Sequence, residues 1–330
     1  MAITDFPAPI PGYSLIEQLY AGSRTLVYRG IREANNQAVA IKLLRREHPS
    51  FSEIINIRNQ YNLANNLRID GIVRAIALER YGNSYALIME DFGGLSLRDY
   101  SKNHVLELKE VLEIAIKLTN ILHYLYQQRV IHKDIKPSNI LIHPITKEIK
   151  ITDFSIASLL PRETQTITNP EVLEGTLAYL SPEQTGRMNR GIDYRSDFYN
   201  LGVTFFELLT GELPFQSNDP MELIHCHIAK KPPLVSEIKP EIPVALSLIV
   251  EKLMAKNAED RYQNALGLKH DLEVCQQQWQ QRGGIPEFMI AQRDLSDRFL
   301  IPEKLYGREN EVNQCENFSF HGAKSTSAIG

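Results

Sequence analysis

The chain has 330 residues, 43% of them hydrophobic and 23% charged, with a formal net charge of -4 at pH 7. This composition predicts a globular protein with a large core, and the slight negative charge argues against nucleic acid as a main partner. The N-terminus lacks a secretory pattern, no stretch reaches the roughly 18 apolar residues of a membrane span, and Cys226, Cys275 and Cys315 lack metal-ligand spacing, so we expect a cytoplasmic protein with free thiols.

Alternating and β-branched runs predict that the first part of the chain, residues 13–92, is rich in strands. The candidate strands are Tyr13–Leu19, Leu26–Arg29, Ala38–Leu43, Val73–Leu78 and Ser84–Met89. One candidate helix, Ser52–Leu67, interrupts them. We therefore expect a small antiparallel sheet with one helix, followed by a hinge near Glu90–Gly94.

Helical periodicity dominates the next part, residues 93–282. Apolar residues between Leu108 and Leu125 recur every three or four positions, which predicts a helix with a buried face. Further helices are predicted at Ser196–Leu209, Val244–Lys256 and Tyr262–Gln281. The fold class is therefore α+β and bilobal, with residues 283–330 as a linker and a disordered tail from about Asn313.

A cluster of polar residues, His132–Asn139, follows the long apolar helix directly. Phosphoryl transfer needs a carboxylate to orient the attacking hydroxyl, a lysine near the transferring charge and a group that holds a metal ion. Asp134, Lys136 and Asn139 supply these three groups. The alternative is an ordinary polar loop between two core elements, but the string resembles the protein kinase catalytic loop.

Asp153-Phe154-Ser155 comes fourteen residues after Asn139 and follows a short predicted strand. An aspartate at a strand end can bind the Mg²⁺ ions that bridge the outer phosphates of ATP. In the family that the chain resembles, this site reads Asp-Phe-Gly. The resemblance therefore implies that Asn139 and Asp153 are the metal ligands, with Ser155 in place of the glycine.

The strand Val39-Ala40-Ile41-Lys42 is similar to the kinase strand whose lysine meets the α- and β-phosphates of ATP. Without the other motifs, a lysine in an apolar strand would be read as protection against edge-to-edge aggregation. The resemblance makes Lys42 catalytic as well as nucleotide-binding. It also implies that ATP contacts Leu19, Gly22, Val27, Ala40, Met89, Glu90 and Phe92.

Three further matches extend the resemblance from about Tyr13 to Gln281. The run Gly175–Glu183 is similar to the end of a kinase activation segment, and together with Lys136 it favours serine or threonine as the acceptor. By the resemblance, Asp197 would fix the backbone of the catalytic loop, and Arg261 would form a buried bidentate pair with Glu183. A surface ion pair is the alternative for Arg261.

The sequence departs from the family in its phosphate-covering loop and in the helix that follows Lys42. Gly22 is the only one of three usual glycines, which suggests a stiffer cover. Gln60 stands where a glutamate would pair with Lys42, so that contact would lose its ionic part. Glu53, two turns earlier, could substitute only if the helix shifts.

A third departure is Lys133, where arginine is commonest. Lysine offers a point charge rather than a bidentate site for a phosphorylated activation loop, so control by phosphorylation is open. The candidate acceptors between Asp153 and Gly175 are Ser158, Thr164, Thr166 and Thr168.

A more specific resemblance lies in Ser181–Arg190 and Asp193–Asp197. These runs are similar to a bacterial branch, common in cyanobacteria, in which a serine/threonine kinase domain precedes an AAA-type ATPase region, a GAF sensor and a histidine kinase. Phe299–Glu309 is similar to the linker into that ATPase region, but no Walker A motif follows. A truncation or an altered reading frame is our hypothesis for the polar end.

Two main functional hypotheses follow. The first is an active serine/threonine kinase that uses ATP and Mg²⁺, acts on a protein substrate and works beside two-component signalling proteins. The second is a pseudokinase or scaffold, favoured by Gln60 and the reduced glycine loop. A small-molecule phosphotransferase is a weaker third hypothesis, because it has no need for Gly175–Glu183.

Overall fold

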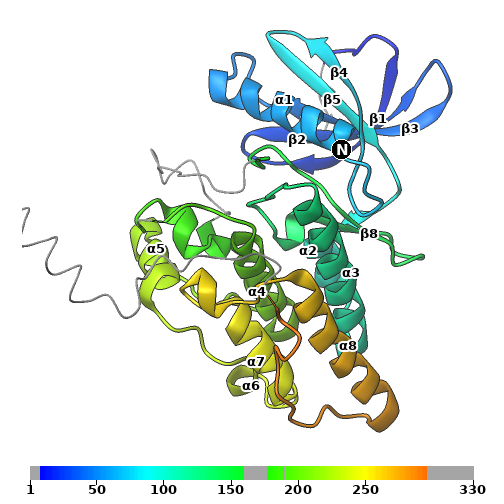
Figure 1. The fold of residues 1–330 in the computed structure, drawn as a ribbon. Coiled ribbons are helices and arrows are strands. Elements are labelled where there is room, and N and C mark those ends of the chain that lie inside the picture. The colour runs from blue at the N-terminus through cyan, green and yellow to red at the C-terminus, as the bar shows by residue number, and fades with distance from the viewer. Residues whose placement is uncertain (1–7, 160–176, 189, 296–330) are drawn as a thin grey trace, which may run out of the picture. The chain divides into compact units, whose positions relative to one another are not determined.

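A computed structural model describes residues 8–159, 177–188 and 190–295. Its first lobe is a five-stranded antiparallel sheet in the order β1-β2-β3-β5-β4, with helix α1 packed against β4 and β5 (Figure 1). The elements of this lobe are β1 (Tyr13–Ala21), β2 (Thr25–Arg32), β3 (Gln37–Leu44), α1 (Phe51–Asn66), β4 (Ala75–Tyr81) and β5 (Ser84–Glu90).

Alternation along β3 assigns the two faces of this sheet. Val39, Ile41 and Leu43 are buried in a small core that the first lobe forms by itself. Successive side chains of a strand point to opposite faces, so Ala40 and Lys42 lie on the other side of the sheet. The lysine is thus placed by the same pattern that builds the core.

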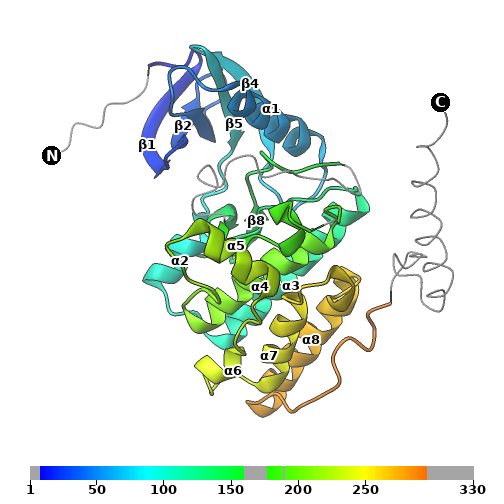
Figure 2. The ribbon, with the colours of Figure 1, turned by 90° about the vertical axis from the view of Figure 1, so that its left-hand side faces the viewer.

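The second lobe is mainly helical and lies below the sheet lobe in Figure 2. Helix α3 packs against α4 and α8, and a three-stranded sheet in the order β6-β7-β8 lies next to it. The elements are β6 (Leu95–Ser96), α2 (Leu97–Asn103), α3 (Leu108–Gln127), η1 (Pro137–Asn139), β7 (Ile140–Ile142), β8 (Ile149–Ile151), η3 (Leu177–Tyr179), η4 (Pro182–Thr185), α4 (Arg195–Thr210), α5 (Pro220–Ala229), α6 (Val235–Ile238), α7 (Val244–Leu253), η5 (Ala258–Asp260) and α8 (Ala265–Arg282).

The expected bilobal α+β architecture is confirmed, and the five predicted strands and five predicted helices are present. Differences lie at helix ends, where capping side chains decide the boundary. Ser50 and Glu53 form a reciprocal capping box that starts α1 at Phe51. The last helix starts at Ala265 rather than Tyr262, because the Asn264 side chain accepts from the Gly267 N–H at 2.6 Å.

Two expectations about the whole chain are tested within the described ranges. None of the helices in these ranges is both long and apolar enough to cross a bilayer. Cys226 and Cys275 are free thiols, as expected, and both are buried, whereas Cys315 lies outside the described residues. The predicted disordered tail from Asn313 lies outside them too.

The part of the linker that the structure describes, residues 283–295, folds back along α8; we call it the return segment. Asp294 accepts hydrogen bonds from the Gln263 N–H at 2.9 Å and the Asn264 N–H at 3.0 Å. A Cβ atom at Gly267 would lie 2.7 Å from the Asp294 Cα, so glycine allows this close approach. The return segment therefore packs as part of the helical lobe, which the sequence pattern after Gly283 did not indicate.

Replacing Asp294 by alanine should lower the free energy of unfolding by about 1–3 kcal/mol, because two partly buried backbone N–H groups lose their acceptor. Chemical denaturation of the full chain measures this, with the exposed neighbour Arg293→Ala as the control. Equal midpoints for the two variants would show that the return segment adds nothing to the stability of the lobe.

Candidate functional site

The catalytic-loop sequence follows α3 and is fixed through its backbone by Asp197, at the start of α4. The His132 N–H donates to Asp197 Oδ2 at 2.8 Å, and the Lys133 N–H donates to Oδ1 at 2.7 Å. Burial raises the pKa of Asp197, although the nearby charges and the hydrogen bonds from these two amides act to lower it. Lys133 has φ 68°, a left-handed conformation that such anchoring maintains. The predicted role of Asp197 is confirmed.

Asp134 lies in a polar cluster with the two other predicted groups of its loop. Its Oδ2 accepts a hydrogen bond from Asn139 Nδ2 at 2.8 Å and is 2.8 Å from Lys136 Nζ. Its Oδ1 is buried and, among the described residues, has no hydrogen-bond partner. One carboxylate oxygen is therefore oriented by the protein, while the other is left as an acceptor for a hydroxyl group.

Lys42 connects the sheet lobe to Asp153. Its Nζ lies 2.9 Å from Asp153 Oδ1 and donates to Gln60 Oε1 at 2.9 Å. Burial alone would raise the pKa of Asp153, but the Lys42 ammonium and hydrogen bonds from Lys42 and Ser155 hold that pKa well below its usual range. The carboxylate is thus charged at any physiological pH, as a ligand for a divalent cation must be.

The assignment of Gln60 as the partner of Lys42 is confirmed. Gln60 is buried on the inner side of α1, where it also approaches Met89 Sδ at 3.8 Å. Glu53 instead caps the first turn of α1, as its side chain accepts from the Ser50 N–H at 2.8 Å. Among the described residues, Lys42 therefore has one charged partner and one neutral partner.

His132 and Phe154 connect the catalytic loop to the Asp153 loop. Their rings meet edge to face with centroids 4.8 Å apart. His132 Nε2 lies 3.0 Å from the Thr152 carbonyl oxygen, and Phe154 is fully buried. The two loops that carry the predicted metal ligands are therefore packed together.

The predicted ATP contacts are divided between the sheet and the segment after it. Val27 pairs with Lys42 across β2 and β3, and Ala40 pairs with Met89 across β3 and β5. Cross-strand partners share a face, so these residues line the side of the sheet that carries Lys42. Leu19 is 40% exposed on β1.

The other three predicted contacts have additional partners. The Glu90 carboxylate accepts from Lys150 Nζ at 2.8 Å, and that ammonium also lies 5.1 Å from the Phe92 ring centroid. Glu90 therefore pairs with β8 by its side chain.

At Gly22 a Cβ atom would lie 2.5 Å from the Tyr20 hydroxyl oxygen, so the single glycine of the loop lets a tyrosine ring fold over it.

Arg261 is buried and uses all five of its N–H donors. It forms a bidentate pair with Glu183 at 2.6 and 2.8 Å, which confirms the predicted contact and excludes the surface alternative. Its other donors go to the carbonyl oxygens of Ala255, Arg195 and Lys256. Burial would raise the pKa of Glu183, but Arg261 lowers it to about 2.

A match to a family model decides the identity. The model that describes the protein kinase domain matches residues 13–279. The chain belongs to the protein kinase family. It is 32% identical to the serine/threonine-protein kinase PrkC of Bacillus subtilis over 80% of this chain and 40% of that protein. The corresponding values for PknB of Mycobacterium tuberculosis are 32%, 79% and 42%.

A third relative is the hybrid signal transduction histidine kinase G of Dictyostelium discoideum, 32% identical over 63% of this chain and 9% of that protein. The chain thus spans less than half the length of these three curated relatives. Within this chain, the protein kinase domain accounts for residues 13–279.

Some residues of the site were not assigned a role from the sequence. Gln184 Nε2 donates to the Lys133 carbonyl oxygen at 2.7 Å, and Asn200 Nδ2 donates to Gln184 Oε1 at 3.1 Å. Asn59 of α1 binds the loop after Asp153. Neutral amides have no charge pattern or periodicity in sequence, so only a resemblance could have marked them.

Some predicted residues of the activation segment lie outside the described residues, namely Thr164, Thr166, Thr168, Gly175 and Thr176. Ser158 is described. Its backbone pairs with Ile131 in both directions at 3.0 Å, and its hydroxyl oxygen is buried. Ser158 is therefore a poor phosphate acceptor in this conformation.

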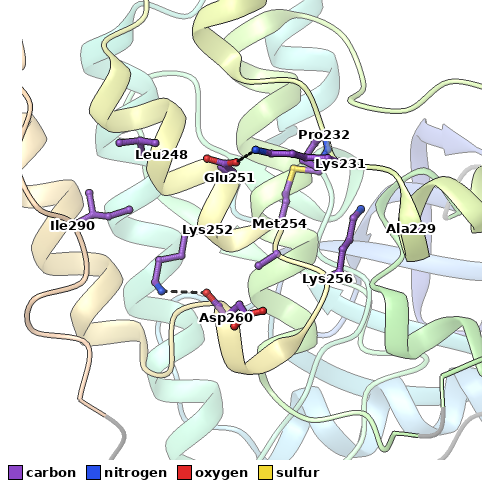
Figure 3. Close-up of a pocket in the computed structure, with 11 residues that line it drawn as sticks. Ala229, Lys231, Pro232, Leu248, Glu251, Lys252, Met254, Lys256, Asp260 and Ile290 are labelled. Atoms are coloured by element: carbon purple, nitrogen blue, oxygen red, sulfur yellow. Dashed lines mark hydrogen bonds and ion pairs between the residues drawn. The ribbon is translucent and has the colours of Figure 1, made fainter.

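A separate cavity of about 550 Å³ lies in the helical lobe (Figure 3). It is lined by the end of α5, by α7 and the residues after it, and by Ile290 of the return segment. None of the predicted catalytic, metal or ATP-contact residues lines it. This cavity is distinct from the site described above.

Proposed function

We propose that the chain is an active serine/threonine protein kinase that transfers the γ-phosphoryl group of ATP to a hydroxyl group of a protein. The observation that carries this proposal is the convergence of Lys42 and Asp153, 2.9 Å apart, beside a catalytic loop whose Asp134 keeps one buried oxygen without a partner among the residues that the structure describes. An acceptor oxygen in this position suits a hydroxyl group that binds there.

Each residue has a distinct role in this proposal. Asp134 would accept a hydrogen bond from the attacking hydroxyl and orient it, while Lys136 would offset negative charge on the phosphoryl group. Lys42 would bind the α- and β-phosphates. Asp153 and Asn139 offer the oxygen ligands that Mg²⁺ prefers, and the ion would neutralise phosphate charge when bound.

The neutral Gln60 does not favour the pseudokinase alternative. It still accepts a hydrogen bond from Lys42 at 2.9 Å, and the ion pair of Lys42 with Asp153 is kept. What is lost is the charge of the contact rather than the position of the lysine. We infer that this kinase aligns Lys42 without an ion pair to α1.

We also propose a setting for this activity. The domain boundaries are a sheet lobe at residues 13–92 and a helical lobe at 93–282, followed by a linker and tail. Similarity to a hybrid signal transduction histidine kinase supports a role beside two-component proteins, and we propose that the protein acts in the cytoplasm. Together with the runs Ser181–Arg190 and Asp193–Asp197, it supports the cyanobacterial-type hybrid branch.

Incubation of the purified chain with labelled ATP, Mg²⁺ and a general protein acceptor tests the proposal. We expect label on serine and threonine after acid hydrolysis, and none with EDTA or with Asp134→Ala. Equal labelling by the wild type and Asp134→Ala, or none by either while nucleotide still binds, would favour the scaffold hypothesis. Label on tyrosine alone would contradict the proposed acceptor class.

A further inference from the structure

Asn59 lies on α1 directly before Gln60 and points a neutral amide at the loop that follows Asp153. Its Nδ2 donates to the carbonyl oxygens of Ala157 at 2.9 Å, Ser155 at 3.1 Å and Phe154 at 3.4 Å. A single amide nitrogen thus faces three backbone acceptors from one short turn. The two N–H groups of the amide can reach three carbonyl oxygens only because these oxygens lie close together.

The backbone of the loop explains why its carbonyls converge. Asp153 has φ 67°, so the chain reverses at the left-handed residue, and the Ala157 N–H then donates to the Phe154 carbonyl oxygen at 3.3 Å. Grouped carbonyl oxygens form a region of negative potential that a donor relieves. Asn59 is that donor, and it comes from the other lobe.

Consecutive residues of α1 therefore contact Lys42 and the loop after Asp153. Gln60 binds Lys42, and Asn59 binds the loop that carries Asp153. Neither contact depends on charge in the helix. Gln60 acts on α1 only through Lys42, whereas Asn59 links α1 directly to the loop that follows Asp153.

We propose that Asn59 is a positioning residue that fixes α1 to the Asp153 loop and so keeps Lys42 and Asp153 aligned in the absence of the usual glutamate. The proposal rests on the proposed kinase function. Asn59 contacts neither Lys42 nor Asp153 by its side chain, so its effect is on their geometry. Misplacement of aligned groups by about 1 Å can cost about 100-fold in rate.

Three variants of the full chain test this, with hydrogen exchange and phosphoryl transfer as readouts. Asn59→Ala should lower kcat by about 10- to 100-fold and speed amide exchange at residues 155–158 and in α1. Asn62→Ala, an exposed asparagine one turn along on α1, is the matched control and should change neither readout.

Asn59→Asp separates positioning from packing. Its carboxylate would face three carbonyl oxygens without a proton to donate, so near neutral pH it should be less active than Asn59→Ala. Protonation at lower pH restores an O–H donor, so activity relative to wild type should rise as the pH falls. If Asn59 only filled space, the activity of Asn59→Asp relative to wild type would not rise as the pH falls.

The outcomes distinguish this proposal from the kinase assignment. If amide exchange in Asn59→Ala is no faster than in Asn62→Ala, the positioning role is overturned, even if the wild type transfers phosphate well. If wild type transfers no phosphate, the exchange readout still decides whether Asn59 fixes the loop. Faster exchange with unchanged kcat would also overturn it, since the contact would then have no effect on alignment.

Discussion

Replacing Asp134 by asparagine should lower kcat for phosphoryl transfer by about 10²- to 10⁴-fold, the usual contribution of a positioned acid or base group. The amide oxygen can still accept the hydrogen bond from Asn139, so the loop keeps its shape. The charge that attracts the hydroxyl proton is lost. Affinity for nucleotide should be nearly unchanged, because Asp134 serves the acceptor side of the reaction.

Steady-state rates with saturating ATP, beside nucleotide titrations by fluorescence, measure the two effects separately. Asp70→Asn, at an exposed position between α1 and β4, is the matched control and should keep the wild-type rate. A loss confined to nucleotide affinity would place Asp134 in ATP binding and contradict the role proposed for it.

Replacing Arg261 by methionine should lower the free energy of unfolding by about 3–5 kcal/mol, because Glu183 would remain buried without its partner. Three backbone carbonyl oxygens would lose a donor as well. The double variant with Glu183→Leu should be less destabilised than Arg261→Met alone, since no charge is then left buried. The exposed pair of Lys231 with Glu251 is the control, and Lys231→Met should barely change the unfolding midpoint.

The pair also has a pH signature. Arg261 lowers the pKa of Glu183 to about 2 from an ordinary 4.5, so the folded state binds its proton less readily than the unfolded state. The contribution to stability is therefore complete above about pH 4.5 and is lost as the pH falls towards 2. Glu183→Gln should show a flatter decline in stability over that interval. Urea titrations at each pH measure the free energy of unfolding. If this free energy fell equally with pH in the wild type and in Glu183→Gln, the result would contradict a buried charged pair.

The fold could be predicted from the sequence because its elements have strong local signals. The apolar stripe of α3 and the alternation of β3 each follow from one buried face. Helix α5 has Asp219 as its N-cap and Pro220 at its first position, a recognisable start that was not used. The short helices α2 and α6 lack the length for a periodic pattern.

Some features of the site could be read from the sequence and others could not. Short motifs contain the predicted catalytic and metal-binding residues, namely Lys42, Asp134, Lys136, Asn139 and Asp153. The distances between these residues depend on how the two lobes pack. Contacts made by amide side chains across the lobes follow from tertiary structure alone and leave no mark in a sequence.

The return segment has a mechanical consequence. It leaves the far end of α8 and comes back to the Gln263–Asn264 backbone, where Asp294 is bound. Tension applied to the polypeptide beyond Leu295 would be borne first by the hydrogen bond from Asn264 Nδ2 to the Leu295 carbonyl oxygen, then by the two at Asp294, and only later by the helix. Traction there would act as a shear on the backbone next to Arg261, so a load on the chain has a short route to the buried pair of Arg261 with Glu183.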